Sequence, residues 1–174
     1  DDGIVIADNA LAGSDALATS SVLAAAIKAG GYDLVICGTE STDARMSVVP
    51  AMLAERLGFA QLTFAGSVVV DGSTVSISRQ TEFGIEEMNA SLPVVVSVVE
   101  INEPRYPSFK GIMAAKKKPL EMKSLSDVGA SAQSAWSAVK DANALPPRST
   151  GVKIEDDGSA GNKLADFLAE RRLV

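Results

Sequence analysis

The sequence predicts an α/β fold in which a parallel sheet is flanked by helices. An Ala/Leu-rich helical segment at residues 16–29 is followed by the nearly continuous apolar run YDLVICG (32–38). A polar loop and a second helical segment at 48–57 come next. An apolar run without polar alternation is typical of a strand buried on both faces of a parallel sheet. Helix, buried strand, loop and helix in this order indicate a doubly wound, Rossmann-like domain.

Local signals place the ends of these first elements. The short apolar run at 4–6 is expected to form a strand. Residues 13–15 supply capping side chains for the helix at 16–29, and the glycines at 30–31 end it as a C-cap. Gly58 ends the helix at 48–57 in the same way. The apolar stripe of the first helix is expected to consist of Val22, Leu23, Ala26 and Ile27.

The middle of the chain changes character. Apolar runs at 68–70 and 75–77 flank Asp71-Gly72, and an Asp-Gly pair supplies the positive φ that a tight hairpin turn needs. The run LPVVVSVV (92–99) predicts a further apolar strand. We therefore expect a β-hairpin added to the parallel sheet.

The last part of the chain is predicted to be an extended arm. Ala, Ser and Asn dominate from residue 130 to 144, and Pro146-Pro147 prevents a helix there. Residues 160–173 are expected to form a terminal helix with Leu164, Phe167 and Leu168 on one face, which must be buried on this chain or on a partner. We expect an α/β domain at 1–129 and an arm with its helix at 130–174.

Composition excludes several kinds of function. The 174 residues carry a net charge of -6, so a basic nucleic-acid footprint is not expected. The absence of histidine removes the commonest general base and metal ligand, and a single cysteine permits no intrachain disulfide. No apolar run approaches the ~20 residues of a membrane span, so we expect an intracellular, cytoplasmic protein. The chain opens on Asp1 without an initiator methionine and is expected to be part of a longer protein.

A candidate nucleotide site lies in the segment CGTESTDARMSVVP (37–50), between the predicted strand and helix. The N-terminus of that helix offers backbone N–H groups and partial positive charge to a phosphate. Asp43 could hold a ribose hydroxyl or order the loop, and further hydroxyls and a cation come from Thr39, Ser41, Thr42, Ser47 and Arg45. There is no GxxxxGK[ST] or GxGxxG motif. An equally open interpretation is a solvated loop of turn and cap residues.

Other groups admit two interpretations each. Cys37 is either an inert buried thiol or a reactive one, and its apolar surroundings favour the first. Arg79 could reach a partner or cofactor, or simply be a surface residue. Trp136 is expected to anchor against some surface. The carboxylates of Glu82, Glu86 and Glu87 could be a catalytic pair, but a solvated face is the default for such a cluster.

The segment NEPRYPSFKGIMAAKKK (102–118) predicts a docking surface for another protein. Pro104 and Pro107 fix φ and stiffen the segment as a loop. Ser108 is expected to cap a helix on which Phe109, Ile112 and Met113 follow at helical spacing. A stiff loop that presents an aromatic ring and a methionine suits protein recognition. The lysines at 116–118 are expected to be its solvated flank.

Several of these segments closely resemble the β subunit of electron-transfer flavoproteins, the FixA family. The resemblance rests on DLVICGTESTD (33–43), LPVVVSV (92–98), NEPRYPSFKGIMAAKKK (102–118) and DVG (127–129), with LAGSDALAT (11–19) and TGVKI (150–154) fitting as well. It covers nearly the whole chain, and the 102–118 block is its most specific part. The actinobacterial branch is the most similar. The family's chains begin earlier, with the first strands of the nucleotide fold.

The resemblance implies an electron carrier rather than an enzyme. The chain would be one half of an αβ heterodimer that takes electrons from flavin dehydrogenases, such as the acyl-CoA dehydrogenases of fatty acid oxidation, toward the respiratory chain. FAD would sit mostly in the α subunit with the β subunit covering its edge, and a structural AMP would be bound in the β subunit. The arm from residue 130 would pack on the α subunit. No nucleic-acid partner and no direct membrane insertion are implied.

The resemblance also assigns residues. Phe109 falls at the position of the apolar residue that inserts into a dehydrogenase. The implied recognition loop comprises Tyr106, Pro107, Ser108, Phe109, Lys110, Gly111, Ile112 and Met113. The implied AMP-binding positions are Cys37, Gly38, Thr39, Thr42, Asp43, Arg45, Met46, Ser47, Val48 and Val49.

This chain departs from the family's pattern at three places. Gln80 stands where the family often has an acidic residue, and Phe83-Gly84 replaces paired glycines. The residues at 47–49 are less polar than in other branches, so phosphate contacts are expected to rest on backbone N–H groups.

Two other functions remain as alternatives. The strand, loop and helix at 32–58 would also suit a stand-alone adenine-nucleotide-binding module of the universal-stress-protein or ATP-pyrophosphatase type, although this leaves 102–118 without a role. A hydrolase that uses the carboxylates at 82–87 is the least supported.

Overall fold

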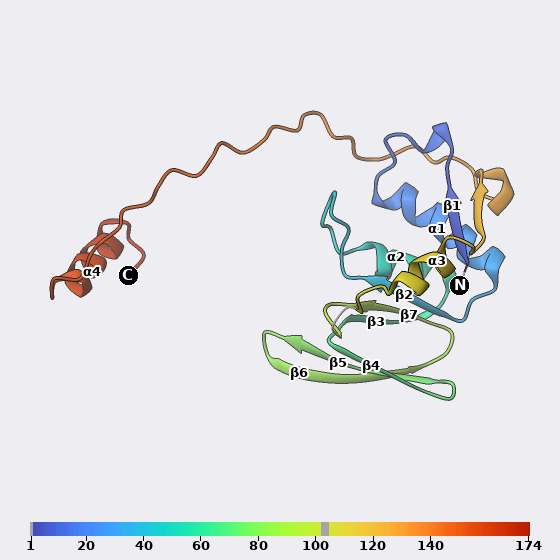
Figure 1. The fold of residues 1–174 in the computed structure, drawn as a ribbon, viewed down its shortest axis with the longest axis horizontal. Coiled ribbons are helices and arrows are strands. Elements are labelled where there is room, and N and C mark those ends of the chain that lie inside the picture. The colour runs from blue at the N-terminus through green and yellow to red at the C-terminus, as the bar shows by residue number, and fades with distance from the viewer. Residues whose placement is uncertain (1, 102–104) are drawn as a thin grey trace. The chain divides into compact units, whose positions relative to one another are not determined.

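The computed structural model describes residues 2–101 and 105–174. The chain divides into two units, Asp1–Val139 and Lys140–Val174, and each is described by itself (Figure 1). The predicted stiffening by Pro104, and the Asn102 and Glu103 of the docking motif, lie outside the described residues.

The first unit contains three small sheets. The main parallel sheet has the order β2-β7-β3, and a second parallel pair joins β1 to β8. The third sheet is antiparallel, in the order β4-β5-β6. With the helices α1 (Ala16–Gly30) and α2 (Val49–Leu57) against the main sheet, this confirms the predicted α/β class. The strands are β1 (Gly3–Ile6), β2 (Leu34–Gly38), β3 (Ala60–Ala65), β4 (Ser67–Asp71), β5 (Thr74–Thr81), β6 (Gly84–Ser91), β7 (Val94–Val98) and β8 (Leu120–Lys123).

The core has three layers with β7 in the middle. Alternate residues of a strand face opposite sides of its sheet. Val94 and Val96 therefore pack with the antiparallel sheet, in a cluster that includes Leu62, Val75 and Ile77. Val95 packs on the other side with Ala24, Leu53 and Ala54 of the two helices. In Figure 1 the antiparallel sheet and the helices lie on opposite sides of β2, β3 and β7.

The prediction that YDLVICG is buried on both faces was wrong. Within the described residues, β2 pairs only with β7 and forms an edge of the main sheet. Ile36 is 58% exposed there, whereas Val94, Val95 and Val96 are each 0% exposed. The doubly buried strand is β7, because β3 pairs along its other side.

The two helices of the main sheet begin and end close to their predicted boundaries. Helix α1 (Ala16–Gly30) is capped by the Asp15 side chain and ends at Gly31, whose φ is 67°. Helix α2 (Val49–Leu57) ends at Gly58, whose φ is 70°. Arg56 joins the two helices: it donates from Nε to the Ser20 hydroxyl at 2.9 Å and from Nη2 to the Leu17 carbonyl oxygen at 3.0 Å.

The buried face of α1 differs from the predicted stripe. Leu23 is 39% exposed, whereas Ala18, Ser20, Val22 and Ala24 are buried. The buried positions are mostly small residues because α1 packs closely against α2. The prediction that Leu23 belongs to the buried stripe was therefore wrong, because it rested on the apolar character of the side chain alone.

The predicted hairpin is part of a larger sheet. Strands β4 and β5 turn at Gly72, whose φ of 56° fits the expected positive-φ turn. The third strand, β6, pairs along the whole of β5 and was not predicted from the sequence. Arg79 on β5 and Glu86 on β6 stand opposite each other and form an ion pair at 2.7 Å.

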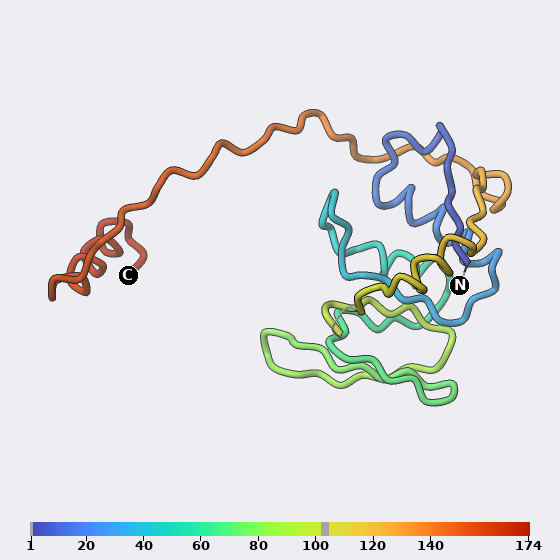
Figure 2. The backbone as a smooth tube through the Cα atoms, in the orientation of Figure 1, coloured from blue at the N-terminus to red at the C-terminus, as the bar shows by residue number. Residues whose placement is uncertain are grey.

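The remaining described elements are short. They are η1 (Asn9–Leu11), α3 (Phe109–Ala115), η2 (Ser126–Val128) and α4 (Ala160–Glu170). From residue 130 to 159 the chain has no helix or strand, as the arm prediction requires, and it can be followed along the tube in Figure 2. Helix α4 has no buried residue; Leu164 and Phe167 are 53% and 40% exposed. Across the described residues, every helix is too short or too polar to cross a membrane.

Candidate functional site

The two segments singled out in the sequence leave the same edge of the main sheet. Gly38 ends β2 and Val98 ends β7, and these two residues are partners in the parallel register. Residues beyond the carboxyl ends of parallel strands are where α/β domains bind ligands. The Thr39 hydroxyl donates to the Val98 carbonyl oxygen at 2.7 Å. The structure thus ties the start of the candidate nucleotide loop to the strand that leads into the docking segment.

The nucleotide loop has an unusual backbone just before α2. Arg45 and Ser47 both adopt left-handed conformations, with φ of 49° and 56°. Residues other than glycine seldom do so, and such positions gather at ligand-binding sites because the surrounding structure must hold them. The strain therefore favours a binding loop over a simple solvated turn.

The first turn of α2 points free backbone donors toward this loop. Its N-cap residue, Val48, makes no side-chain capping hydrogen bond, and Pro50 has no N–H. Among the described residues, nothing accepts a hydrogen bond from the N–H groups of Val49 or Ala51. Uncapped N–H groups at a helix N-terminus suit an anionic group such as a phosphate.

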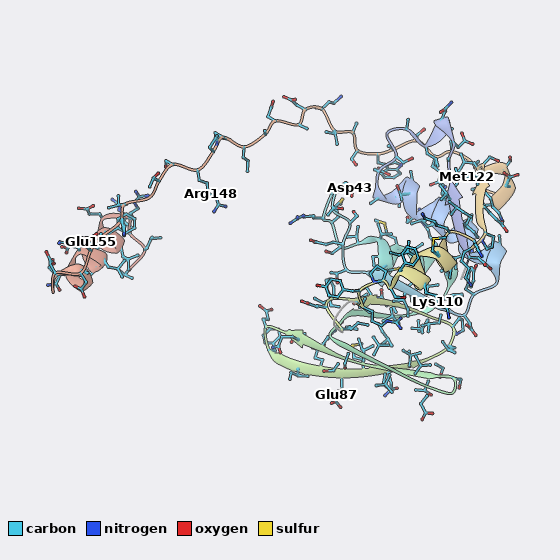
Figure 3. All side chains as sticks on the ribbon, in the orientation of Figure 1. Asp43, Glu87, Lys110, Met122, Arg148 and Glu155 are labelled. Atoms are coloured by element: carbon cyan, nitrogen blue, oxygen red, sulfur yellow. The ribbon has the colours of Figure 1, made fainter. Side chains whose placement is uncertain are left out.

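Asp43 is held in place by its neighbours in the loop. The Ser41 hydroxyl and the Ala44 N–H both donate to the Asp43 carboxylate, and these hydrogen bonds lower the pKa of Asp43 below its ordinary value. Asp43 lies at the exposed end of the loop (Figure 3). This geometry fits a residue that orders the loop. Thr42, Arg45 and Met46 are exposed as well, and none of the three side chains turns into the core.

Glu40 belongs to this site, although it was not among the residues predicted from the sequence. The Ser47 hydroxyl donates to the Glu40 carboxylate at 3.3 Å. A negative charge therefore lies beside the residue expected to contact phosphate. A carboxylate does not suggest a phosphate site, and the position of Glu40 seven residues before Ser47 carries no recognisable spacing signal.

The docking segment forms the predicted helix and exposes its apolar face. Ser108 caps α3, accepting from the Gly111 N–H at 3.1 Å. No residue of α3 is buried: Phe109 is 81% exposed, and Ile112 and Met113 are 41% and 44% exposed. Tyr106 before the helix is 95% exposed. Pro107 and Lys110 are exposed too, and Figure 3 labels Lys110 on this helix.

The other candidates gain no catalytic arrangement. Glu86 and Glu87 are consecutive on β6 and so project to opposite faces; Glu86 pairs with Arg79, and Glu87 points away from the sheet (Figure 3). Burial raises the pKa of the half-buried Cys37 thiol, which makes it a weak nucleophile. In the described part of the chain, no group of three acidic or cysteine side chains is arranged to hold a metal ion.

The comparison with known families decides what kind of domain carries these loops. The model of the electron transfer flavoprotein domain matches residues 1–128, most of the chain. Proteins named electron transfer flavoprotein subunit beta also align with it. The chain belongs to the electron transfer flavoprotein β-subunit family. This confirms the resemblance and its actinobacterial character, because β subunits from Mycobacterium are among the relatives.

These electron transfer flavoprotein relatives align along the whole chain. The "Electron transfer flavoprotein subunit beta" of Mycobacterium leprae is 40% identical over 181 residues, covering 100% of this chain and 68% of that protein. The protein of the same name from Mycobacterium tuberculosis is 39% identical with the same coverage. That of Syntrophomonas wolfei is 37% identical over 172 residues, covering 97% of this chain and 65% of its own length.

Proposed function

We propose that this chain is the β subunit of a heterodimer that carries electrons from flavin dehydrogenases, such as acyl-CoA dehydrogenases, toward the respiratory chain. Family membership supports an electron-transport role. The carrier role asks for no catalytic side chain of its own: the flavin supplies the redox chemistry, and the protein positions it and docks partners. A role in fatty acid oxidation and a cytoplasmic location are part of the proposal.

The observation that carries the docking role is the exposed face of α3. Phe109, Ile112 and Met113 stand at helical spacing, on a helix that buries none of its residues. A large apolar residue that inserts into a partner's pocket is the usual centre of a protein interface. Phe109 is the proposed anchor on the dehydrogenase, with Tyr106 and Lys110 at the rim.

AMP binding is proposed for the loop between β2 and α2. The uncapped N–H groups of Val49 and Ala51 would hold the phosphate, and Asp43 would hold the ribose or the loop itself. These groups fit an adenine nucleotide without any phosphate-binding glycine motif. The implied positions at the β2 end, from Cys37 to Thr39, would lie beside the same nucleotide.

FAD is proposed to be bound by an α subunit, with this chain covering its edge. The arm and α4 are proposed to pack on that same subunit, because the helix has an apolar face that includes Leu164 and Phe167, and none of the helix residues is buried within its own unit. A helix of this kind is stable chiefly through a packing partner.

The proposal as a whole is tested by co-expression with the α subunit of the same organism. A yellow flavin-containing complex is expected to co-purify, and AMP is expected to be released when it is denatured. A colourless chain that elutes alone, although the α subunit is folded in the same extract, would contradict the proposal.

Replacing Glu40 with glutamine is expected to strengthen AMP binding. The amide oxygen can still accept from Ser47, but the negative charge beside the phosphate position is gone. For two charges about 4 Å apart in water, the repulsion is about 1 kcal/mol, which corresponds to about fivefold in Kd. Isothermal titration of the two heterodimers, each freed of nucleotide, measures the difference.

The matched control is Glu82→Gln, which removes the same charge from the turn between β5 and β6. It is expected to leave the Kd for AMP unchanged. Weaker AMP binding by Glu40→Gln would instead assign the Glu40 carboxylate a contact with the nucleotide.

Tight ATP binding with turnover by wild type would favour the universal-stress type of module.

A further inference from the structure

The two carboxylate oxygens of Asp15 bind two different parts of the chain. Oδ1 accepts from the Ala18 N–H at 2.9 Å and caps helix α1. Oδ2 accepts from the backbone N–H of Trp136 at 2.7 Å and of Ser137 at 3.2 Å. The Ser137 hydroxyl lies 3.5 Å from the same oxygen. Asp15 therefore links the first helix to a segment more than a hundred residues later.

In the part of the chain that the structure describes, neither secondary structure nor apolar burial holds that segment. Residues 131–139 form no helix or strand, and Asp15 makes all of the hydrogen bonds that these residues form within the described structure. The Trp136 side chain is 87% exposed and Val139 is 88% exposed, so apolar burial does not fix the segment. The contact is made through backbone N–H groups.

We propose that Asp15 is a clasp that fixes the point at which the C-terminal arm leaves the α/β domain. Because the clasp holds the backbone, it presents the indole of Trp136 at a defined place on the surface while the chain beyond remains extended. Three N–H donors and one hydroxyl favour the charged form of the carboxylate and lower the pKa of Asp15. Asp15 is thus a positioning residue for the arm.

The variant Asp15→Asn separates the two roles of this side chain, which are to cap α1 and to bind the backbone at 136–137. Asn caps helices as well as Asp does, so its oxygen can keep the bond to Ala18. Its NH2 group then stands where Oδ2 was, and an NH2 group cannot accept from Trp136 or Ser137. Asp15→Asn should therefore open the clasp and leave α1 intact.

The test is amide hydrogen exchange of the full chain, with the exchange rate of each amide measured by NMR. Hydrogen bonds to a charged acceptor are stronger than those between neutral groups, so the amides of Trp136 and Ser137 are expected to exchange at least about tenfold faster in Asp15→Asn than in wild type. The amides of α1 should keep their protection. The fluorescence anisotropy of Trp136, the only tryptophan, should fall in the variant.

Two further variants keep the result decisive. Asp15→Ser retains a capping oxygen but has no second acceptor, and it should behave as Asp15→Asn does. Asp141→Asn is the control, because Asp141 binds only its neighbours Ala142 and Asn143, and it should change neither amide. Equal exchange at Trp136 and Ser137 in wild type and in both Asp15 variants would overturn the proposal, as would unprotected amides in wild type.

Discussion

Replacing Phe109 with alanine is expected to slow electron acceptance from an acyl-CoA dehydrogenase by about thirtyfold at limiting concentration, with the flavin content of the heterodimer unchanged. The residue is 81% exposed on a helix that contributes nothing to the core of this chain. Removing the central apolar anchor of an interface commonly costs about 2 kcal/mol or more of binding free energy, which corresponds to the expected thirtyfold loss in rate. Stopped-flow reduction of the heterodimer by a substrate-reduced dehydrogenase measures the rate.

Phe83→Ala is the matched control for this experiment. Phe83 is 91% exposed in the turn between β5 and β6. Phe83→Ala therefore removes a similarly exposed ring from a different part of the chain. Its rate should equal that of wild type. If the two alanine variants transfer electrons equally fast, Phe109 is not the anchor; if Phe109→Ala loses flavin, the residue has a structural role instead.

The second large effect is expected in the core. Leu53 of α2 is 2% exposed and packs with Ala24, Ala54 and Val95 between the helices and β7. Leu53→Ala removes these contacts and leaves a cavity, which lowers the free energy of unfolding by about 2 to 5 kcal/mol. Domains are stable by only about 5 to 15 kcal/mol, so the midpoint of urea unfolding should fall markedly.

Met46→Ala is the comparison for Leu53→Ala, because Met46 is 57% exposed in the loop just before the same helix. Its free energy of unfolding should change by no more than about 0.5 kcal/mol, as is usual for surface substitutions. The midpoint of urea unfolding should therefore stay close to that of wild type. Circular dichroism at increasing urea gives both midpoints. A loss at Met46 as large as that at Leu53 would show that the loop, and not the helix packing, limits stability.

The sequence was sufficient to predict the local elements that carry strong signals. Asp15 and Ser108 are caps, Gly31 and Gly58 end helices, and Gly72 turns a hairpin, each through its own backbone chemistry. Such signals act within a few residues and therefore survive in a single sequence. The family motif at 102–118 was specific enough to indicate the family.

Strand order could not be predicted in the same way. β2 and β7 are both apolar, and only the position of β3 makes β7 the central strand. β3 was not predicted, although Gln61 and Thr63 alternate with apolar residues; a register shift between Leu62 and Ala65 interrupts its burial pattern. The apolar pattern indicated that a buried strand exists, but which strand it is depends on pairings between distant segments.

The same limit applies to the candidate site. The strand, loop and helix order indicated where a ligand would bind, and the structure places those residues at the carboxyl edge of the sheet. The bond from Thr39 to Val98 and the pairing of Ser47 with Glu40 arise only when the loop is folded. Arg45 and Ser47 adopt left-handed conformations without being glycines, so their residue types do not indicate the positive φ.

The central place of β7 has a consequence for how the chain reaches its native state. This strand, VVVSV, has no charge and no proline, and its residues favour extended pairing. Its two partners are parallel strands from earlier in the chain, and parallel pairing must wait for long loops to close. Until then the segment is exposed and resembles sequences that self-associate into aggregates. The apolar residues that make β7 the centre of the folded domain thus make it prone to aggregate before its partner strands have paired with it.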